Sequence, residues 1–199
     1  MSRPSTAILR LRASAIPLFA LLTGAGPGAR AATAQGVPNR EAAIEVRKQY
    51  LADLDGLRGK FLALAEAFPA EKYAWRPGPG VRSVGEVFMH VADELYTWAV
   101  TSYGATPSPV IGTGPDADQK FEAKSTKPEV LKHLREGAQY SARTLNAIDP
   151  AAITGTRKIF GRDRTIIETS FGMIDDLHEH LGQLIAYARM NGVKPPWSK

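Results

Sequence analysis

Apolar residues recur every three or four positions in four separate segments, and this periodicity limits the fold more than any other feature of the sequence. The segments are residues 41–68, 83–103, 128–148 and 170–190, and connections rich in glycine or proline separate them. Each segment carries one apolar face, which is stable in water only when it packs against another such face. The sequence therefore predicts an all-α fold, an antiparallel four-helix bundle.

Two connections between these helices are unusually long. Residues 104–128 are expected to form a loop, and a loop of this length is often a lid or a binding loop, or else merely disordered. Residues 149–168 are irregular in pattern, and the stretch TRKIFGRDRT within them is typical of a short hairpin or an extended turn. Neither connection contains a repeat or a low-complexity run.

Residues 1–34 have the order of a cleavable signal peptide. They contain four arginines and no acidic residue, then the apolar run AIPLFALLTGAG, and finally Ala32-Thr33-Ala34, which fits an A-x-A cleavage site. The apolar run is shorter than the roughly 20 residues that span a bilayer. We therefore expect an exported protein, periplasmic or secreted, whose domain is residues 35–199; the alternative is an uncleaved N-terminal anchor.

The charge balance changes when this leader is set aside. The whole chain has a net charge of +5, and the leader supplies +4, so the remainder carries about +1 (5 − 4). A nearly neutral domain gives no reason to expect a nucleic-acid partner, and without the leader it gives none to expect a membrane. The chain has no cysteine, which excludes disulfides, zinc–thiolate sites and a cysteine nucleophile.

The helix at residues 170–190 presents titratable side chains on two different faces. At 100° per residue, His180 and Asp176 lie on the apolar side with Met173 and Leu184, whereas His178 lies on the opposite side. A histidine and a carboxylate four residues apart are close enough to bind one metal ion together, or simply to pair with each other. If Asp176 is buried, something must neutralise its charge.

The helix at residues 83–103 carries His90 at the edge of its apolar stripe, with Glu86 and Glu94 one turn away on either side. If the two helices face each other, His90, Asp176 and His180 form three metal ligands with an open position, which suits Zn, Ni, Fe or Mn. The less specific alternatives are a paired polar core and, for the two glutamates, a solvated helix face. We expect His133 and His178 at the surface.

Three stretches of the sequence together resemble a known family. They are YAWRPGPG, RSVGEVFMHVADE and HLGQLIAYARMNGVKPPWS, and they resemble the DinB-like (damage-inducible, YfiT-like) four-helix bundle metal-binding proteins. The resemblance extends from about residue 41 to the C-terminus. It implies a four-helix bundle of the up-up-down-down type, often a homodimer, with a divalent metal held by three side chains.

The resemblance also implies which residues bind this metal. The histidine on the second helix matches His90, and the histidine before the Gly-Gln pair of the last helix matches His180. The third ligand is commonly a histidine four residues earlier, where this chain has Asp176. His178 is the alternative third ligand, although the helix geometry argues against it.

Two functional hypotheses follow. In the first, the protein is a metal-dependent hydrolase or thiol transferase acting on a small molecule of unknown identity, with His90, Asp176 and His180 as ligands. Glu86 or Glu94 would then act as a base behind the ligands, and Tyr187 would line the pocket. In the second, the protein is a non-catalytic binding module without metal.

Overall fold

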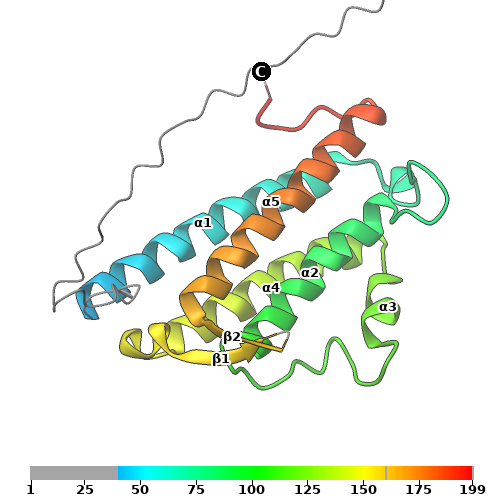
Figure 1. Ribbon diagram of the computed structural model, residues 1–199. Helices are drawn as coiled ribbons and strands as arrows, with labels where there is room; N and C mark the ends of the chain where they lie inside the picture. Colours follow the sequence, from blue (N-terminus) through cyan, green and yellow to red (C-terminus); the bar gives the residue numbers. More distant parts are fainter. Residues whose placement is uncertain (1–39, 160, 199) are drawn as a thin grey trace, which may run out of the picture. The chain divides into compact units, whose positions relative to one another are not determined.

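The computed structural model describes residues 40–159 and 161–198, so the predicted leader at residues 1–34 lies outside the described residues. Four long helices form a bundle, which confirms the predicted all-α fold (Figure 1). They are α1 (Arg40–Ala67), α2 (Val84–Thr101), α4 (Lys127–Ala147) and α5 (Ile166–Met190). In the part of the chain that the structure describes, no helix is both long and apolar enough to cross a membrane.

The helices do not simply alternate in direction. The Lys127 ammonium, at the start of α4, donates to the carbonyl of Phe68 just beyond the end of α1, so α1 and α4 are antiparallel. By contrast, Gly85 near the start of α2 lies beside Ser125, and Gly137 in the middle of α4 lies beside Ala92. The consecutive long helices α2 and α4 are therefore parallel, contrary both to the antiparallel order expected from the sequence and to the up-up-down-down order that the resemblance implies. The long connection between them allows this, because it returns the chain to the end where α2 began (Figure 1).

The core lies between the four helices and is mainly aliphatic and aromatic. Its largest fully buried side chains are Phe68, Phe88, Phe121, Leu64, Met89, Leu134, Leu145, Met173, Leu177 and Leu184. The connection just before α4 approaches α2 so closely that a Cβ at Gly85 would lie 2.2 Å from the carbonyl oxygen of Ser125. Only glycine fits this position, because real Cβ atoms do not come so near a backbone oxygen.

A capping box at the start of α2 and the expected short hairpin before α5 are present. The Ser83 hydroxyl accepts from the backbone N–H of Glu86, and the Glu86 carboxylate accepts from the backbone N–H of Ser83, which fixes the start of α2. Strands β1 (Thr156–Ile159) and β2 (Arg162–Thr165) pair antiparallel and lead directly into α5. Two short 3₁₀ helices, η1 (Ala70–Lys72) and η2 (Pro150–Thr154), complete the connections.

The sequence predicts a loop over residues 104–128, and this prediction is only partly correct. The segment contains a short helix, α3 (Ala117–Glu122), which packs on α2 (Figure 1). Ala117 and Phe121, four residues apart, form its buried face. Six residues are too few to show a helical periodicity in the sequence, and α3 is held by tertiary burial of Phe121 rather than by its own propensity.

Candidate metal site

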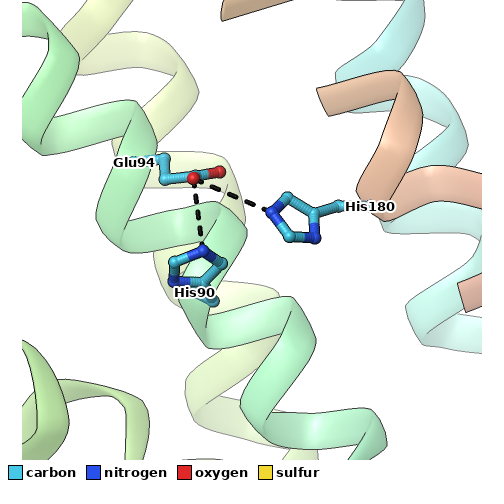
Figure 2. Close-up of side chains that lie close together, drawn as sticks. All are labelled: His90, Glu94 and His180. Carbon is cyan, nitrogen blue, oxygen red and sulfur yellow. Dashed lines mark ion pairs between the residues drawn. The ribbon is translucent and has the colours of Figure 1, made fainter. Parts of the chain in front are cut away.

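Helices α2 and α5 place two histidines and one carboxylate together. The capping box at Ser83 sets the register of α2, so that His90 and Glu94, one turn apart, both face α5. His180 on α5 meets them from the other side (Figure 2). One ligand atom from each of the three side chains lies within 4.8 Å of the other two.

The separations between these atoms are close to those around a bound metal. The Glu94 Oε1 atom lies 3.2 Å from His90 Nε2 and 3.8 Å from His180 Nε2 (Figure 2). The two imidazole rings are nearly perpendicular, at 87°, with centroids 4.9 Å apart. Around one zinc ion, with bonds of about 2.0–2.1 Å, neighbouring ligand atoms lie about 3.3 Å apart in tetrahedral geometry. Small side-chain movements would thus bring all three atoms onto one ion.

The other nitrogen of each ring is already occupied by a neighbour. His90 Nδ1 lies 2.7 Å from the Glu122 carboxylate, and His180 Nδ1 lies 3.2 Å from the Gln183 side-chain carbonyl. Both neighbours are acceptors, so each Nδ1 carries a proton and donates it. The Nε2 atoms are left to face Glu94, which is how metal-binding histidines are normally held.

Glu94 provides an independent test of whether a cation fits here. Its Oε2 atom is buried and accepts no hydrogen bond from a nitrogen or hydroxyl donor among the described residues. The Asp176 carboxyl is close enough to affect the Glu94 pKa, and it could bond to Glu94 only by carrying a proton of its own. A buried carboxylate oxygen without a donor, beside a second carboxyl group, is well suited to a positive ion.

The charges of the metal-free site stabilise one another. Burial lowers the pKa of His90, but its hydrogen bonds to Glu122 and Glu94 raise that pKa to about 9. Burial raises the pKa of Glu94, but the neighbouring imidazoles of His180 and His90 lower that pKa to about 2. The nearby Glu94 carboxylate also raises the pKa of His180. Without metal, the site at neutral pH therefore pairs an ionised Glu94 carboxylate with a protonated His90 imidazole.

Asp176 lies at the edge of this group. Its Oδ2 atom is 3.9 Å from His180 Nε2, and its side chain is 34 % exposed, against 14 % for Glu94. Burial and the neighbouring Glu94 raise the pKa of Asp176 to about 6. The structure thus brings His90, Asp176 and His180 together as the sequence suggested, but places Glu94 directly between the two imidazoles. Asp176 as a ligand stays a prediction.

The other residues singled out in the sequence have different positions. Glu86 is engaged at the N-terminus of α2, where it also pairs with Arg76 at 3.0 Å. His178 is exposed, and its Nδ1 hydrogen-bonds to the carbonyl of Ile174. His133 was expected at the surface and is instead buried, because α3 covers that face of α4 and places Phe121 against the His133 ring.

Tyr187 lies behind the site. Its hydroxyl accepts from the Gln183 side-chain amide at 3.1 Å and donates to the backbone carbonyl of Arg82 at 3.4 Å, while its ring packs edge-on against Trp75. The Arg82 guanidinium in turn holds Glu122 through two hydrogen bonds. These contacts link the groups behind the two imidazoles, so both rings are supported by one connected network.

Sequence reasoning missed part of this arrangement. The sequence suggests Glu94 as a base behind the ligands or as part of a solvated helix face, although the spacing His90-x-x-x-Glu94 on one helix face is itself a signal for a two-residue metal site. No pattern in the sequence singles out Glu122. It is 32 residues from His90 in the sequence, and no local pattern connects the two.

Comparison with known proteins establishes the family. A family model described as the DinB superfamily matches residues 53–184, which is more than half of the chain and includes His90, Glu94 and His180. The chain belongs to the DinB superfamily. This confirms the resemblance drawn from the sequence motifs.

Solved structures of DinB-like proteins show the same fold. One from Bacillus subtilis is 18% identical, with a TM-score of 0.58, and the match covers 73% of this chain and 93% of that one. Another, from Bacillus cereus ATCC 10987, is 15% identical with a TM-score of 0.60, over 80% of this chain and 97% of that one. At such identities the likeness concerns the fold alone. No protein with a curated description matches this DinB-superfamily chain significantly.

Proposed function

We propose that this DinB-superfamily protein binds one divalent metal ion between α2 and α5, with His90, Glu94 and His180 as ligands. The observation that carries the proposal is the position of Glu94, whose buried carboxylate lies between two Nε2 atoms that their neighbours leave free. Two imidazoles and one carboxylate suit Zn, Ni, Fe or Mn, and their chemistry does not choose among these metals.

For the reaction, we propose metal-dependent hydrolysis or thiol transfer on a small molecule. A divalent metal held here would lower the pKa of a water or thiol ligand and so supply a nucleophile near neutral pH. Asp176 is the residue placed to handle the proton. It lies beside Glu94 and partly faces solvent, so its carboxylate can pass a proton between the site and the solvent.

The test is metal analysis of the purified protein, without a polyhistidine tag, after incubation with Zn, Ni, Fe or Mn and removal of the excess. We expect about one ion per chain, lost in His90→Ala and in His180→Ala. The matched control is His178→Ala, which removes a histidine from the same helix but from its exposed face. Equal loss of metal in all three variants would contradict the assigned site.

A second pair of variants identifies the third ligand. Glu94→Gln and Asp176→Asn each remove one negative charge with little change of shape. We expect Glu94→Gln to abolish stoichiometric binding and Asp176→Asn to weaken it less, because Asp176 lies farther from the imidazole nitrogens. The reverse order would assign the ligand to Asp176, as the sequence first suggested.

A non-catalytic role remains the alternative, and one observation favours it. The two imidazoles and Glu94 already pair with one another, so the polar cluster is stable without a metal. This alternative predicts no retained metal after incubation with any of the four ions, and a melting temperature that a chelator does not change.

We further propose that the protein is exported, acts on a small molecule rather than nucleic acid, and forms a homodimer. The leader pattern in residues 1–34 and the small net charge of the remainder support the first two points, and the family resemblance supports the third. N-terminal sequencing of the protein from cell fractions tests export, and we expect the N-terminus of the exported protein near Gln35. Light scattering tests the dimer.

A further inference from the structure

Helix α3 reaches the candidate metal site from outside the four-helix bundle. Phe121 anchors it: this ring is 1 % exposed and packs edge-on against His133, with centroids 4.9 Å apart, and against Tyr96 at 6.2 Å. The next residue is Glu122, the last of α3. The position of Glu122 is therefore set by a buried aromatic contact rather than by an exposed turn.

The Glu122 carboxylate is held between two partners. Its Oε1 atom lies 2.7 Å from His90 Nδ1 and also accepts from Arg82 Nη2 at 3.1 Å, while its Oε2 accepts from Arg82 Nε at 2.9 Å. The side chain is only 14 % exposed. A two-point contact with a guanidinium fixes the plane of the carboxylate and not merely its distance. Glu122 thus has little freedom to leave the imidazole.

We propose that Glu122 is a positioning residue for the metal site, which orients the His90 ring and its protons so that Nε2 faces Glu94 and His180. This inference rests on the proposed function. An imidazole can rotate about its bond to Cβ and can carry its single proton on either nitrogen. A carboxylate fixed at Nδ1 holds the ring in one orientation and keeps a proton on Nδ1. Nε2 then has a free lone pair and is a stronger metal ligand.

The alternative is that Glu122 serves only to dock α3 through its ion pair with Arg82. The two roles differ in what they affect. A docking residue changes the stability of the protein and leaves metal affinity nearly unchanged once the protein is folded. A positioning residue changes metal affinity and the state of the His90 ring, even in a variant that melts at the same temperature.

The experiment measures zinc affinity of the full chain by competition with a chromophoric chelator, beside its melting temperature. We expect Glu122→Ala to bind zinc roughly 10- to 100-fold more weakly, the usual cost of losing such a partner. Glu122→Gln should lose less, because its amide oxygen still accepts from Nδ1. The matched control is Asp118→Asn, which removes a charge from an exposed position of the same helix and should change affinity less than about twofold.

Two outcomes would overturn the inference. One is a zinc affinity of Glu122→Ala and Glu122→Gln that equals the affinity of the unaltered protein. The other is an equal loss of zinc affinity in all three variants, because the loss would then come from the removal of any negative charge near the site. If Glu122→Ala fails to fold, the isosteric Glu122→Gln alone tests the inference. We then expect it to lose more zinc affinity than Asp118→Asn does.

A metal-independent measurement separates this inference from the proposed function. If the unaltered protein binds no zinc, the proposed function fails. The His90 ring can still be examined by long-range ¹H–¹⁵N spectra of the metal-free protein, at a pH where the ring is neutral. We expect the proton on Nδ1, and a shift of the proton toward Nε2 in Glu122→Ala. Identical ring spectra in the two proteins would overturn the positioning role.

Discussion

The metal-free protein should become less stable as the pH rises from 7 to 9.5, and His90 is the main cause. Its pKa in the folded protein is about 9, against 6.5 for the free side chain, so folding favours the protonated ring. This stabilisation is complete below pH 6.5 and is lost as the pH rises through 9. His180, whose pKa is raised by Glu94, acts in the same direction.

The size of the effect follows from the pKa of His90. A rise from 6.5 to about 9 corresponds to about 3 kcal/mol at about 1.4 kcal/mol per unit, for a side chain that is 20 % exposed. Roughly 2 kcal/mol of this should disappear between pH 7 and pH 9.5. Burial raises the pKa values of Asp93 and Asp176 to about 6, so both titrate mainly below this interval.

The assay is urea unfolding with a chelator present, at several pH values between 7 and 9.5. The control is His90→Gln, which keeps a polar side chain of similar size but cannot titrate; its stability should change with pH much less. Saturating zinc should reverse the slope, because metal binding requires neutral imidazoles and so strengthens as protons leave. A flat profile for the unaltered metal-free protein, or an equal slope in His90→Gln, would refute the reasoning.

Three further predictions concern stability. Gly85→Ala should destabilise the protein by more than about 2 kcal/mol, because the new Cβ would lie 2.2 Å from a backbone oxygen. Gly56→Ala, at an exposed helical position with open space around it, should stabilise the protein by up to about 1 kcal/mol. Urea unfolding of both variants measures the two effects. Tyr50→Phe should cost about 1–2 kcal/mol in the same assay, because the buried hydroxyl of Tyr103 donates to Tyr50 at 2.6 Å and would lose that acceptor. Zinc at 100 times its dissociation constant should raise the unfolding free energy by about 2.7 kcal/mol, with no such gain in His180→Ala.

Part of the site could be predicted from the sequence, because its residues are neighbours on single helices. A spacing of four residues places His90 beside Glu94, and Asp176 beside His180, in any α-helix. The same angular argument placed His178 away from the site, and the structure agrees. The sequence could not show whether Glu94 or Asp176 lies between the imidazoles, because that depends on how α2 and α5 pack against each other.

Other features were hidden because they depend on contacts between distant segments. The sequence around His133 shows a residue off the apolar stripe of its helix, and only the docking of Phe121 from α3 makes that face an interior. Glu122 belongs to a stretch with no periodicity of its own. Its role exists only because the chain crosses from the end of α2 back to the start of α4.

By itself, then, the sequence determined the class of fold, the approximate extent of four long helices and the presence of two titratable pairs, because these depend on spacing within one helix. Only the tertiary structure decided that α2 and α4 run parallel, that Glu94 lies between His90 and His180, and that α3 supplies a carboxylate to the site. The physical reason is that helical periodicity is a local property. The direction, depth and neighbours of each helix are set by burial of side chains that lie far apart in the chain.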